Sequence, residues 1–430
     1  MGHLMRTGEI YSLVPHLAWF DMRVTDTFYT FSQLSPLEIV PAKLRAPFAS
    51  GGLGLRQLAP LSPAANFASL LLCLPILTQV FPDMAAYIEK VKSNPSDLTW
   101  PALSDLEEAQ QRSFLLAETL EDRGLPLMAT MVRSWQALHT LGCRETIPAH
   151  PIDILKGFYA RKAAAADSER KGFKIQHFIS QEIGRIVGND LLKSNPDPAV
   201  VARTLSNQDS GATAWLRVVP TKSSLRLSPS EFRQGVRMFC GLSPAGLPPG
   251  ARCKCGEQLV LSHILSCKSL KGRTARHDAV VEDTFQWLRK RRIFVRKEVV
   301  GLVPGTANRV DLVVRADGVT YWCDVTIGDP GGPSYLPSAA SKMGFVAGRL
   351  EGSKISKWSA LAPKGVVIQP LALESTGLVG TAMRGFLQAM QKLSSSGPRR
   401  ALLLSQLSVT CIRGGVEMVQ QAAGHGGEAE

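Results

Sequence analysis

Two aspartates lie in strand-like segments where paired carboxylates could hold a divalent cation. Residues 309–315 and 319–327 are rich in β-branched and aromatic residues, and the Asp317-Gly318 dipeptide between them is a strong hairpin signal. If these two residues form the loop, counting back from it places Asp311 directly opposite Asp324 on the same face of the hairpin. The two Cβ atoms would then be roughly 5 Å apart.

Facing carboxylates repel each other and destabilise a sheet, a cost that makes sense if a cation bridges them. Magnesium or manganese, which favour oxygen ligands, would be the ion. Such a site can polarise a phosphodiester and help to generate hydroxide from bound water, while a nearby lysine stabilises the developing charge. The alternative is an exposed face with two unrelated aspartates, and a bulge or longer loop would break the register.

A second set of ligands precedes this hairpin: Cys253, Cys255, His263 and Cys267. His263 and Cys267 are four positions apart in a predicted helical segment, so their side chains share one face. Four soft or borderline ligands within fifteen residues predict a structural zinc site, because no position is left open for catalysis. The alternative is a chance cluster of buried cysteines and a core histidine. The other cysteines are scattered, which argues against a disulfide framework: Cys73, Cys143, Cys240, Cys323 and Cys411.

Basic residues gather around the predicted hairpin. The chain has a formal net charge of +13, and phosphate-rich partners gain affinity from such charge through counterion release. We therefore expect a groove that attracts nucleic acid; the alternatives are a solvated face or a nuclear-import patch at 289–292. The residues before and after an expected helix are Lys268, Lys271, Arg273, Arg276, Arg289, Lys290, Arg291, Arg292, Arg296 and Lys297.

The 430 residues, 45% of them hydrophobic, are enough for several cores. The pattern predicts a multidomain α plus α/β protein: a mainly helical N-terminal half, a small zinc knuckle, and a C-terminal mixed sheet flanked by helices. Residues 51–56, GGLGLR, lack the spacing of a phosphate cradle and predict a structural turn. Ser228, Pro229 and Glu231 predict the start of a helix that ends near Gly241.

We expect five segments: 1–165, helical; 166–250, a helical connector; 251–270, the zinc knuckle; 271–395, the domain of the aspartate pair; and 396–430, a C-terminal helix and flexible tail. Residues 163–174, rich in Ala, Lys and Arg, would form a solvated connecting helix or a basic helix that touches nucleic acid. Helical spacing in the first segment is clearest at 65–80 and 113–138. With no signal peptide or membrane span in the pattern, we expect an intracellular protein without a membrane partner.

The order of these motifs resembles the C-terminal region of site-specific non-LTR retrotransposon proteins. The resemblance is carried by the Cys-x-Cys, His and Cys ligands, then Arg276-His277-Asp278, Glu298, Arg309-Val-Asp311 and Asp324-Val-Thr326. In that family a zinc knuckle precedes a restriction-like endonuclease of the PD-(D/E)xK class, which nicks target DNA for target-primed reverse transcription. The resemblance implies a nuclear, magnesium-dependent endonuclease with DNA as target, and element RNA and a separate reverse transcriptase as further partners.

Upstream, the chain is similar to the region that follows a reverse-transcriptase palm. The palm itself and its Asp-Asp dipeptide are missing, so no polymerase activity is expected.

The chain departs from the family pattern at two positions. Val310 stands where proline is usual, and Thr326 stands where the lysine of the Asp-x-Lys form is expected. The resemblance implies a lysine supplied instead by a downstream helix with a Lys-x-x-Lys-aromatic pattern, which the segment 354–358 fits. Lys354 is the first choice, Lys357 the second and Lys342 the third.

Three further residues receive roles from the resemblance. Glu298 would add a metal ligand or orient water, and Arg276 and His277 would bind phosphate or buttress the core. The nucleic-acid-binding set is then Arg273, Arg276, His277, Arg289, Lys290, Arg291, Arg292 and Lys357. The alternative function is an inactive retroelement remnant that binds nucleic acid through its zinc knuckle and basic surface.

Overall fold

The computed structural model describes residues 10–59, 175–248 and 250–426, with isolated residues at 61–69 and 133. Chain contacts divide the protein into two compact units, Met1–Phe28 with Leu55–Asn189, and Tyr29–Gly54 with Asp190–Glu430. The helices expected at 65–80, 113–138 and 163–174 lie mostly or wholly outside the described residues. All the candidate site residues belong to the second unit.

The first unit contributes most of α2 (Ile10–Ser32) and of α9 (Ile175–Lys193) to the described structure. Within it, the Asp21 carboxylate accepts hydrogen bonds from the backbone amides of Leu58 and Ala59, at 2.8 and 2.9 Å. Leu17 packs against Ala65 beside these bonds. Asp21 therefore fixes the segment at 58–59 against α2.

The glycines at 51–54 form the structural turn that the sequence predicts. Gly51 has φ 78° and ends the short 3-10 helix η1 (Phe48–Ser50) in the left-handed region, where glycine avoids the steric cost of a Cβ atom. A Cβ atom at Gly51 would lie 2.3 Å from the Thr204 carbonyl oxygen, and one at Gly52 would lie 2.1 Å from that of Ala46. These glycines are needed for close backbone approach.

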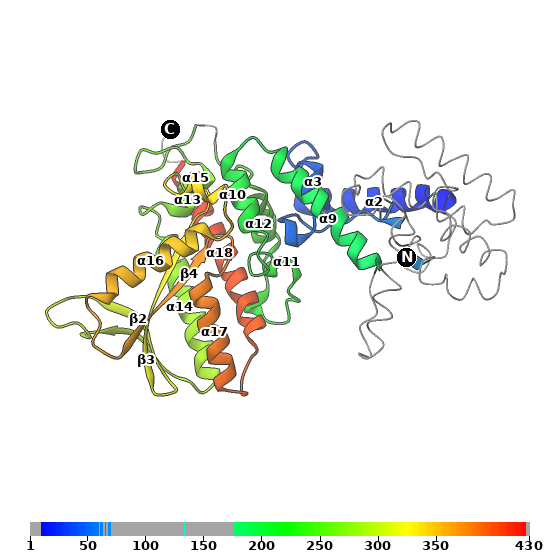
Figure 1. Cartoon of the computed structure of the whole chain (residues 1–430). Helices are drawn as coiled ribbons and strands as arrows, with labels where there is room; N and C mark the ends of the chain where they lie inside the picture. Colours follow the sequence, from blue (N-terminus) through cyan, green and yellow to red (C-terminus); the bar gives the residue numbers. More distant parts are fainter. Residues whose placement is uncertain are drawn as a thin grey trace, which may run out of the picture. The chain divides into compact units, whose positions relative to one another are not determined.

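The second unit is built on a four-stranded mixed sheet in the order β1-β2-β3-β4 (Figure 1). Neighbouring strands are antiparallel except β3 and β4, which are parallel. A parallel pair needs a crossover connection, and α16 forms it. The strands are β1 (Phe294–Val300), β2 (Arg309–Ala316), β3 (Val319–Gly328) and β4 (Val366–Glu374). The expected mixed sheet flanked by helices is confirmed.

Helices cover both faces of this sheet (Figure 1). On one face, α14, α17 and α18 enclose the main core, which includes Leu312, Cys323 and Leu371 from the strands. On the other face, α16 brings Trp358 against Val313 and Trp322. The helix bounds are α14 (Gly272–Lys290), α16 (Phe345–Ser359), α17 (Thr381–Leu393) and α18 (Arg400–Gly426).

A group of shorter helices surrounds this layer. The predicted helix start at Ser228 is confirmed: its hydroxyl accepts from the Glu231 amide at 3.2 Å, while the Glu231 carboxylate accepts from the Ser228 amide. The helix ends at Gly241 with φ 74°. The bounds are α3 (Pro41–Arg45), α10 (Pro198–Ser206), α11 (Ala214–Arg217), η3 (Ser223–Leu225), α12 (Pro229–Cys240), α13 (Leu261–Ser266) and α15 (Leu336–Ala339).

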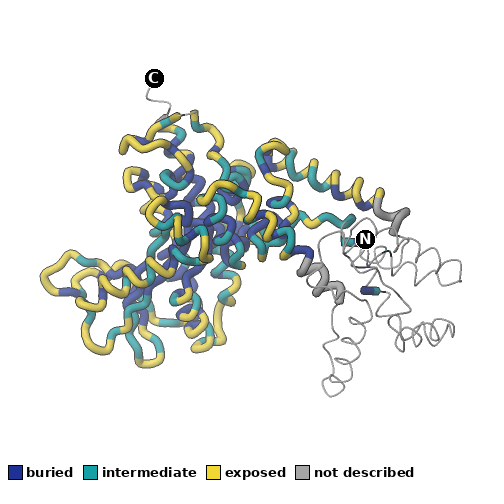
Figure 2. The backbone as a smooth tube through the Cα atoms, turned by 45° about the horizontal axis from the view of Figure 1, so that its top comes forward, coloured by how far each residue is buried: buried dark blue, intermediate teal, exposed yellow. Residues whose placement is uncertain are grey.

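The C-terminal helix α18 belongs to the core, although the sequence suggested a separate terminal segment. It packs along α14, where Gln406 and Thr410 donate hydrogen bonds to the Asp283 carboxylate. Of the described helices, α18 alone is long and apolar enough to cross a membrane by length and composition, and 67% of that stretch is buried inside the structure. Figure 2 shows buried backbone concentrated in the interior of this unit.

The second unit holds the knuckle, the sheet domain and the terminal helix together with residues 190–250 of the expected connector. A buried ion pair shows how the connector and sheet domain are joined. The Arg203 guanidinium on α10 lies 2.8 Å from the Asp329 carboxylate just after β3, and the two side chains are 4% and 0% exposed. The sequence alone did not predict this ion pair, because its two residues are 126 positions apart in the chain.

Replacing Asp329 by alanine should leave Arg203 buried and unpaired, and should lower the free energy of unfolding by about 3–5 kcal/mol. Urea denaturation would measure the loss. Glu282→Ala is the matched control, because its pair with Lys297 is 43% and 39% exposed and should be worth less than about 1 kcal/mol. Equal effects of the two substitutions would contradict the role given to the buried pair.

Candidate functional site

The predicted hairpin register is confirmed, and it sets Asp311 opposite Asp324. The β2–β3 ladder runs from Ala316↔Val319 to Leu312↔Cys323, and the same register continued by one position sets Asp311 opposite Asp324. Asp317 and Gly318 at the turn have φ 50° and 72°, as a type I′ turn requires. Asp311 is 7% exposed and Asp324 is 5% exposed, so both carboxylates are buried.

Asp324 is surrounded by donors from the helix α16. Lys354 Nζ lies 2.7 Å from Asp324 Oδ1, and Lys357 Nζ lies 3.6 Å from Oδ2. The indole N–H of Trp358 also donates to Oδ2. Because these three residues are spaced by three and one positions along one helix, they can face the same point on β3. The structure therefore brings the lysine favoured from the sequence into contact with Asp324.

Asp311 has a different set of partners. Its Oδ2 atom accepts from the backbone amide of Val325 at 2.7 Å and lies 3.3 Å from His277 Nε2. Burial acts to raise the pKa of Asp311, but the hydrogen bonds with His277 and the Val325 amide outweigh it and hold that pKa below its ordinary value of 3.8. Asp311 is therefore ionised at neutral pH.

His277 connects Asp311 to a third carboxylate. Its Nδ1 atom lies 2.9 Å from Asp278 Oδ1. Burial acts to lower the pKa of His277, and the hydrogen bonds with Asp311 and Asp278 reverse this, so the pKa lies above the ordinary value of 6.5. The family resemblance implied phosphate binding or a core role for His277, and its contact with Asp311 was not predicted.

Glu374 at the end of β4 fixes the helix that carries the lysines. Its Oε1 atom accepts from the Val346 and Ala347 amides, at 3.1 and 3.3 Å, in the first turn of α16. A carboxylate there satisfies amides that lack an intrahelical partner and complements the helix dipole. Burial raises the pKa of Glu374, since the side chain is almost fully enclosed.

A second carboxylate ties the same helix to its neighbour. The Oε1 atom of Glu351, in the middle of α16, accepts from the Ala382 amide in the first turn of α17, at 2.8 Å. With Glu374 at its start and Glu351 in its middle, α16 is held against β4 and α17. The position of Lys354 over Asp324 depends on both attachments.

For three other residues considered from the sequence, the hydrogen bonds and ion pairs of the described residues include none with the aspartate pair. Glu298 is in the exposed strand β1, with φ 55°, and its carboxylate is 3.6 Å from Arg309 Nη1. Lys342 is exposed after α15. Thr326 lies on β3 opposite Ala372 of β4. The contacts of the described residues thus favour Lys354 as the amine nearest the pair and give Glu298 an arginine partner instead.

Two of the predicted nucleic-acid-binding arginines are buried, which contradicts a phosphate contact for both and leaves Arg276 with its alternative role in the core. Arg276 is 2% exposed and donates from Nη2 to the Leu265 carbonyl oxygen at 2.9 Å. Arg291 is 3% exposed and donates to the carbonyl oxygens of Gln391, Ser394 and Pro398. Both side chains donate to backbone carbonyls inside the protein, Arg276 through Nη2 and Arg291 through Nη1 and Nη2. The exposed members of the set are Arg273, Arg289, Lys290, Arg292 and Lys357.

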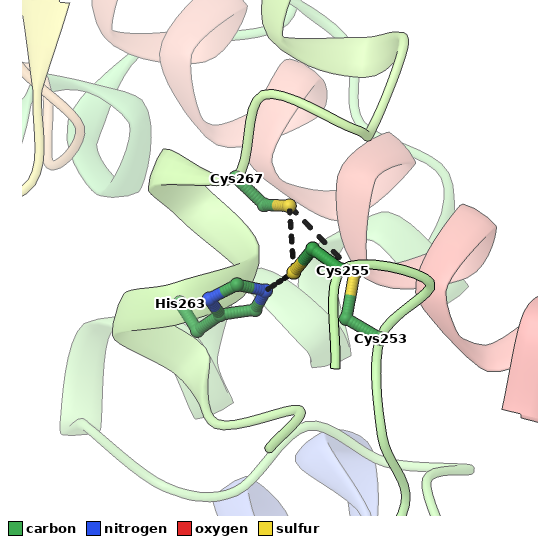
Figure 3. A group of neighbouring side chains, drawn as sticks. All are labelled: Cys253, Cys255, His263 and Cys267. Atoms are coloured by element: carbon green, nitrogen blue, oxygen red, sulfur yellow. Dashed lines mark hydrogen bonds between the residues drawn. The ribbon is translucent and has the colours of Figure 1, made fainter. Parts of the chain in front are cut away.

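The predicted zinc ligands come together in space (Figure 3). Cys253 and Cys255 come from a tight turn, His263 from α13, and Cys267 from the end of that helix, and their ligand atoms all lie within 4.8 Å of one another. They form a Cys3His cluster that could bind zinc.

The distances between these atoms suit tetrahedral zinc. Cys267 Sγ lies 3.6 Å from Cys253 Sγ and 3.9 Å from Cys255 Sγ, and Cys255 Sγ lies 3.3 Å from His263 Nε2. Zn–S bonds of about 2.3 Å in a tetrahedron separate two sulfurs by about 3.8 Å. Four protein ligands fill the coordination sphere, so the role of such an ion is structural.

Replacing Cys267 by serine should remove a soft ligand and reduce bound zinc from about one ion per chain to a small fraction. Metal analysis after gel filtration would measure the content. Cys411→Ala is the control: this cysteine is buried in the core around α18, outside the cluster, and its loss should leave the zinc content unchanged. A wild-type protein that binds no zinc when the ion is supplied would contradict the assignment.

Comparison of the sequence with protein-family models and with curated proteins finds no match. The chemistry of the site must therefore be inferred from its own residues. These are a buried pair of carboxylates with an ammonium on one and an imidazole on the other, and a separate cluster of three thiols and one imidazole.

Proposed function

We propose that this chain is a magnesium- or manganese-dependent endodeoxyribonuclease of the PD-(D/E)xK class that nicks DNA, with zinc as a structural ion. The observation that carries the proposal is the buried pair of Asp311 and Asp324 with Lys354 Nζ at 2.7 Å from Asp324. Two carboxylates and a lysine are the groups this hydrolysis needs. The motif order, which resembles site-specific non-LTR retrotransposon proteins, supports the same assignment.

The donor chemistry of the pair fits a small, hard cation. Asp311 and Asp324 offer carboxylate oxygens from facing strand positions, and the depressed pKa of Asp311 keeps that ligand ionised. A divalent cation held there would supply Lewis-acid polarisation of a phosphodiester and a more acidic bound water. Asp311 and Asp324 would hold it.

The chain's own residues have separable roles around this pair. Trp358 orients the Asp324 carboxylate through its indole N–H, and Lys354 places a positive charge beside it. That charge would stabilise the phosphate as negative charge develops on it. His277 orients Asp311 from the other side and carries a proton on its imidazole at slightly acidic pH, since its pKa is raised.

Basic side chains on the surface support a DNA partner. Arg273, Arg289, Lys290, Arg292 and Lys357 are exposed, and Lys357 is also next to the aspartate pair. Such charges position a phosphate backbone without reading its sequence. The resemblance adds a nuclear location and an association with element RNA and a separate reverse transcriptase.

A second candidate is a zinc-dependent nucleic-acid-binding protein that does not cut. Two observations favour it: Thr326 replaces the usual lysine, and both oxygens of Asp324 already accept hydrogen bonds from α16. A cation must compete with those donors for the same carboxylate. We favour the nuclease because the same helix supplies the amine that position 326 lacks.

Replacing Asp311 or Asp324 by asparagine should abolish magnesium-dependent nicking of supercoiled plasmid, because the pair loses a charged oxygen ligand. The conversion of supercoiled to open circular plasmid measures the activity. Asp317→Asn is the matched control: it lies in the exposed turn of the same hairpin, and asparagine tolerates its positive φ. Wild-type protein that carries zinc, binds DNA and never nicks it with either cation would establish the second candidate instead.

Lys354 and Lys357 should differ in their contributions to cutting. Lys354→Ala should reduce the nicking rate by about 10²-fold, a loss typical of one electrostatic donor, because its ammonium is 2.7 Å from Asp324. Lys357→Ala should reduce the rate by less than about tenfold, since that side chain is more exposed and its ammonium more distant. Single-turnover rates at saturating protein separate this effect from weaker binding. The reverse order would identify Lys357 as the catalytic amine.

A further inference from the structure

An exposed aromatic side chain and two arginines lie together on the first two strands of the sheet. Phe294 begins the edge strand β1 and is 52% exposed. It pairs across strands with Arg315 of β2, whose guanidinium carbon is 5.4 Å from the ring centroid. Arg296, two positions along β1, is also exposed. The proposed function uses none of these three residues.

Strand alternation places these residues on the same sheet face as the aspartate pair. Val313 contributes to the α16 side of the sheet, whereas Leu312 and Val314 contribute to the core on the other side. Arg315 and Asp311 are each two positions from Val313, so they share its face. Phe294 shares that face as the partner of Arg315, and Arg296 as the partner of Val313.

The surface around Phe294 is predominantly basic. Besides Arg296 and Arg315, Arg292 is exposed two residues before Phe294, and Arg289 and Lys290 end the preceding helix α14. Within the segments 289–298 and 315–317 the acids are Asp317, in the turn after β2, and Glu298, which is paired with Arg309. Surfaces that bind single-stranded nucleic acid typically combine an exposed aromatic ring with surrounding positive charge.

We propose that Phe294, Arg296 and Arg315 form a stacking platform for an unpaired stretch of the DNA strand next to the cutting site. The Phe294 ring and the Arg315 guanidinium offer flat faces to bases, and Arg296 contacts the backbone. The assignment of the strand as DNA depends on the proposed function. The proposal of a stacking platform depends only on the exposure and charge of these three residues.

The exposed Phe294 ring favours a single strand over a duplex as the ligand. In a duplex the faces of the bases are already stacked on their neighbours, so an exposed ring has nothing to stack on except at an opened position. A duplex backbone would use the arginines alone and would leave Phe294 in water. A protein strand added to the β1 edge is the other conceivable occupant, but exposed arginine and lysine on an edge strand oppose such pairing.

The platform lies within reach of the carboxylate pair. Arg315 follows Asp311 by four positions on β2, which corresponds to about 13 Å at about 3.3 Å per residue. At about 3.4 Å per stacked nucleotide this distance spans roughly four nucleotides. Val313, between Arg315 and Asp311 on this face, is covered by Trp358, so a strand held on the platform would approach the pair around this covered position and not straight along β2.

The test is equilibrium binding of the full chain to labelled oligonucleotides of about 20 nucleotides, a length that exceeds typical single-strand sites. Fluorescence anisotropy is recorded without added magnesium or manganese, so that binding is measured apart from cleavage. The probes are oligodeoxythymidine, a DNA duplex of equal length and oligouridine. Phe294→Leu keeps apolar volume and removes the aromatic face. Val300→Ala is the control, because Val300 is on the same strand and 67% exposed.

Phe294→Leu should weaken binding of oligodeoxythymidine at least about fivefold and change duplex binding less than about twofold. Arg296→Gln should weaken both, and Val300→Ala neither. Unchanged single-strand binding by Phe294→Leu, or an equal loss on the duplex, would overturn the platform. Tighter binding of oligouridine than oligodeoxythymidine would overturn its assignment to DNA. A wild-type chain that never nicks DNA but shows the expected pattern would refute the proposed nuclease and leave the platform standing.

Discussion

The burial of two facing carboxylates is the constraint on which this part of the structure depends. Asp311 and Asp324 occupy neighbouring strand positions with almost no exposure, and two such charges cost free energy unless each finds partners. Side chains from two different helices supply these partners. Helix α16 provides an ammonium and an indole N–H to Asp324, and His277 at the start of α14 reaches Asp311. The packing of both helices is therefore coupled to the charge of the hairpin.

Further buried polar groups hold the elements that surround the two aspartates. Helix α16 can hold Lys354 over Asp324 only if its own first turn is fixed, and Glu374 does this through the Val346 and Ala347 amides. Just after β3, the buried Asp329 is held by Arg203 and by the Ser375 hydroxyl. The parallel strands β3 and β4 thus end in a buried polar network, which depends on α10 as well as on the sheet.

Local patterns in the sequence predicted a large part of this arrangement. The Asp317-Gly318 turn fixed the register of the hairpin, the capping box at Ser228 marked the start of α12, and ligand spacing grouped Cys253, Cys255, His263 and Cys267. Each of these features is decided within about fifteen residues of chain, where turn and helix geometry leave few options. The position of Lys354 also followed from a short pattern, but through the family resemblance.

The predictions that were wrong, or not made, involve contacts between distant segments. Arg276 and Arg291 look like surface charges in a basic stretch, yet both donate to backbone carbonyls that only folding brings near. The pairing of His277 with Asp311 and that of Arg203 with Asp329 have no signal in spacing. The C-terminal helix itself was predicted, but its burial among several other helices was not, because those contacts join distant segments.

The two proposed metal sites differ in ligand type, but the backbone connects them. Thiolates and imidazole suit zinc at the knuckle, and carboxylates suit a harder ion at the hairpin. Arg276 holds the Leu265 carbonyl of α13, between the ligands His263 and Cys267, and the next residue along the chain is His277. A change in the position of residues 253–267 would therefore move the first turns of α14, and with them the His277 imidazole that orients Asp311. The Cys3His cluster therefore helps to position His277 beside Asp311, although none of its four residues contacts the aspartate pair in the hydrogen bonds of the described residues.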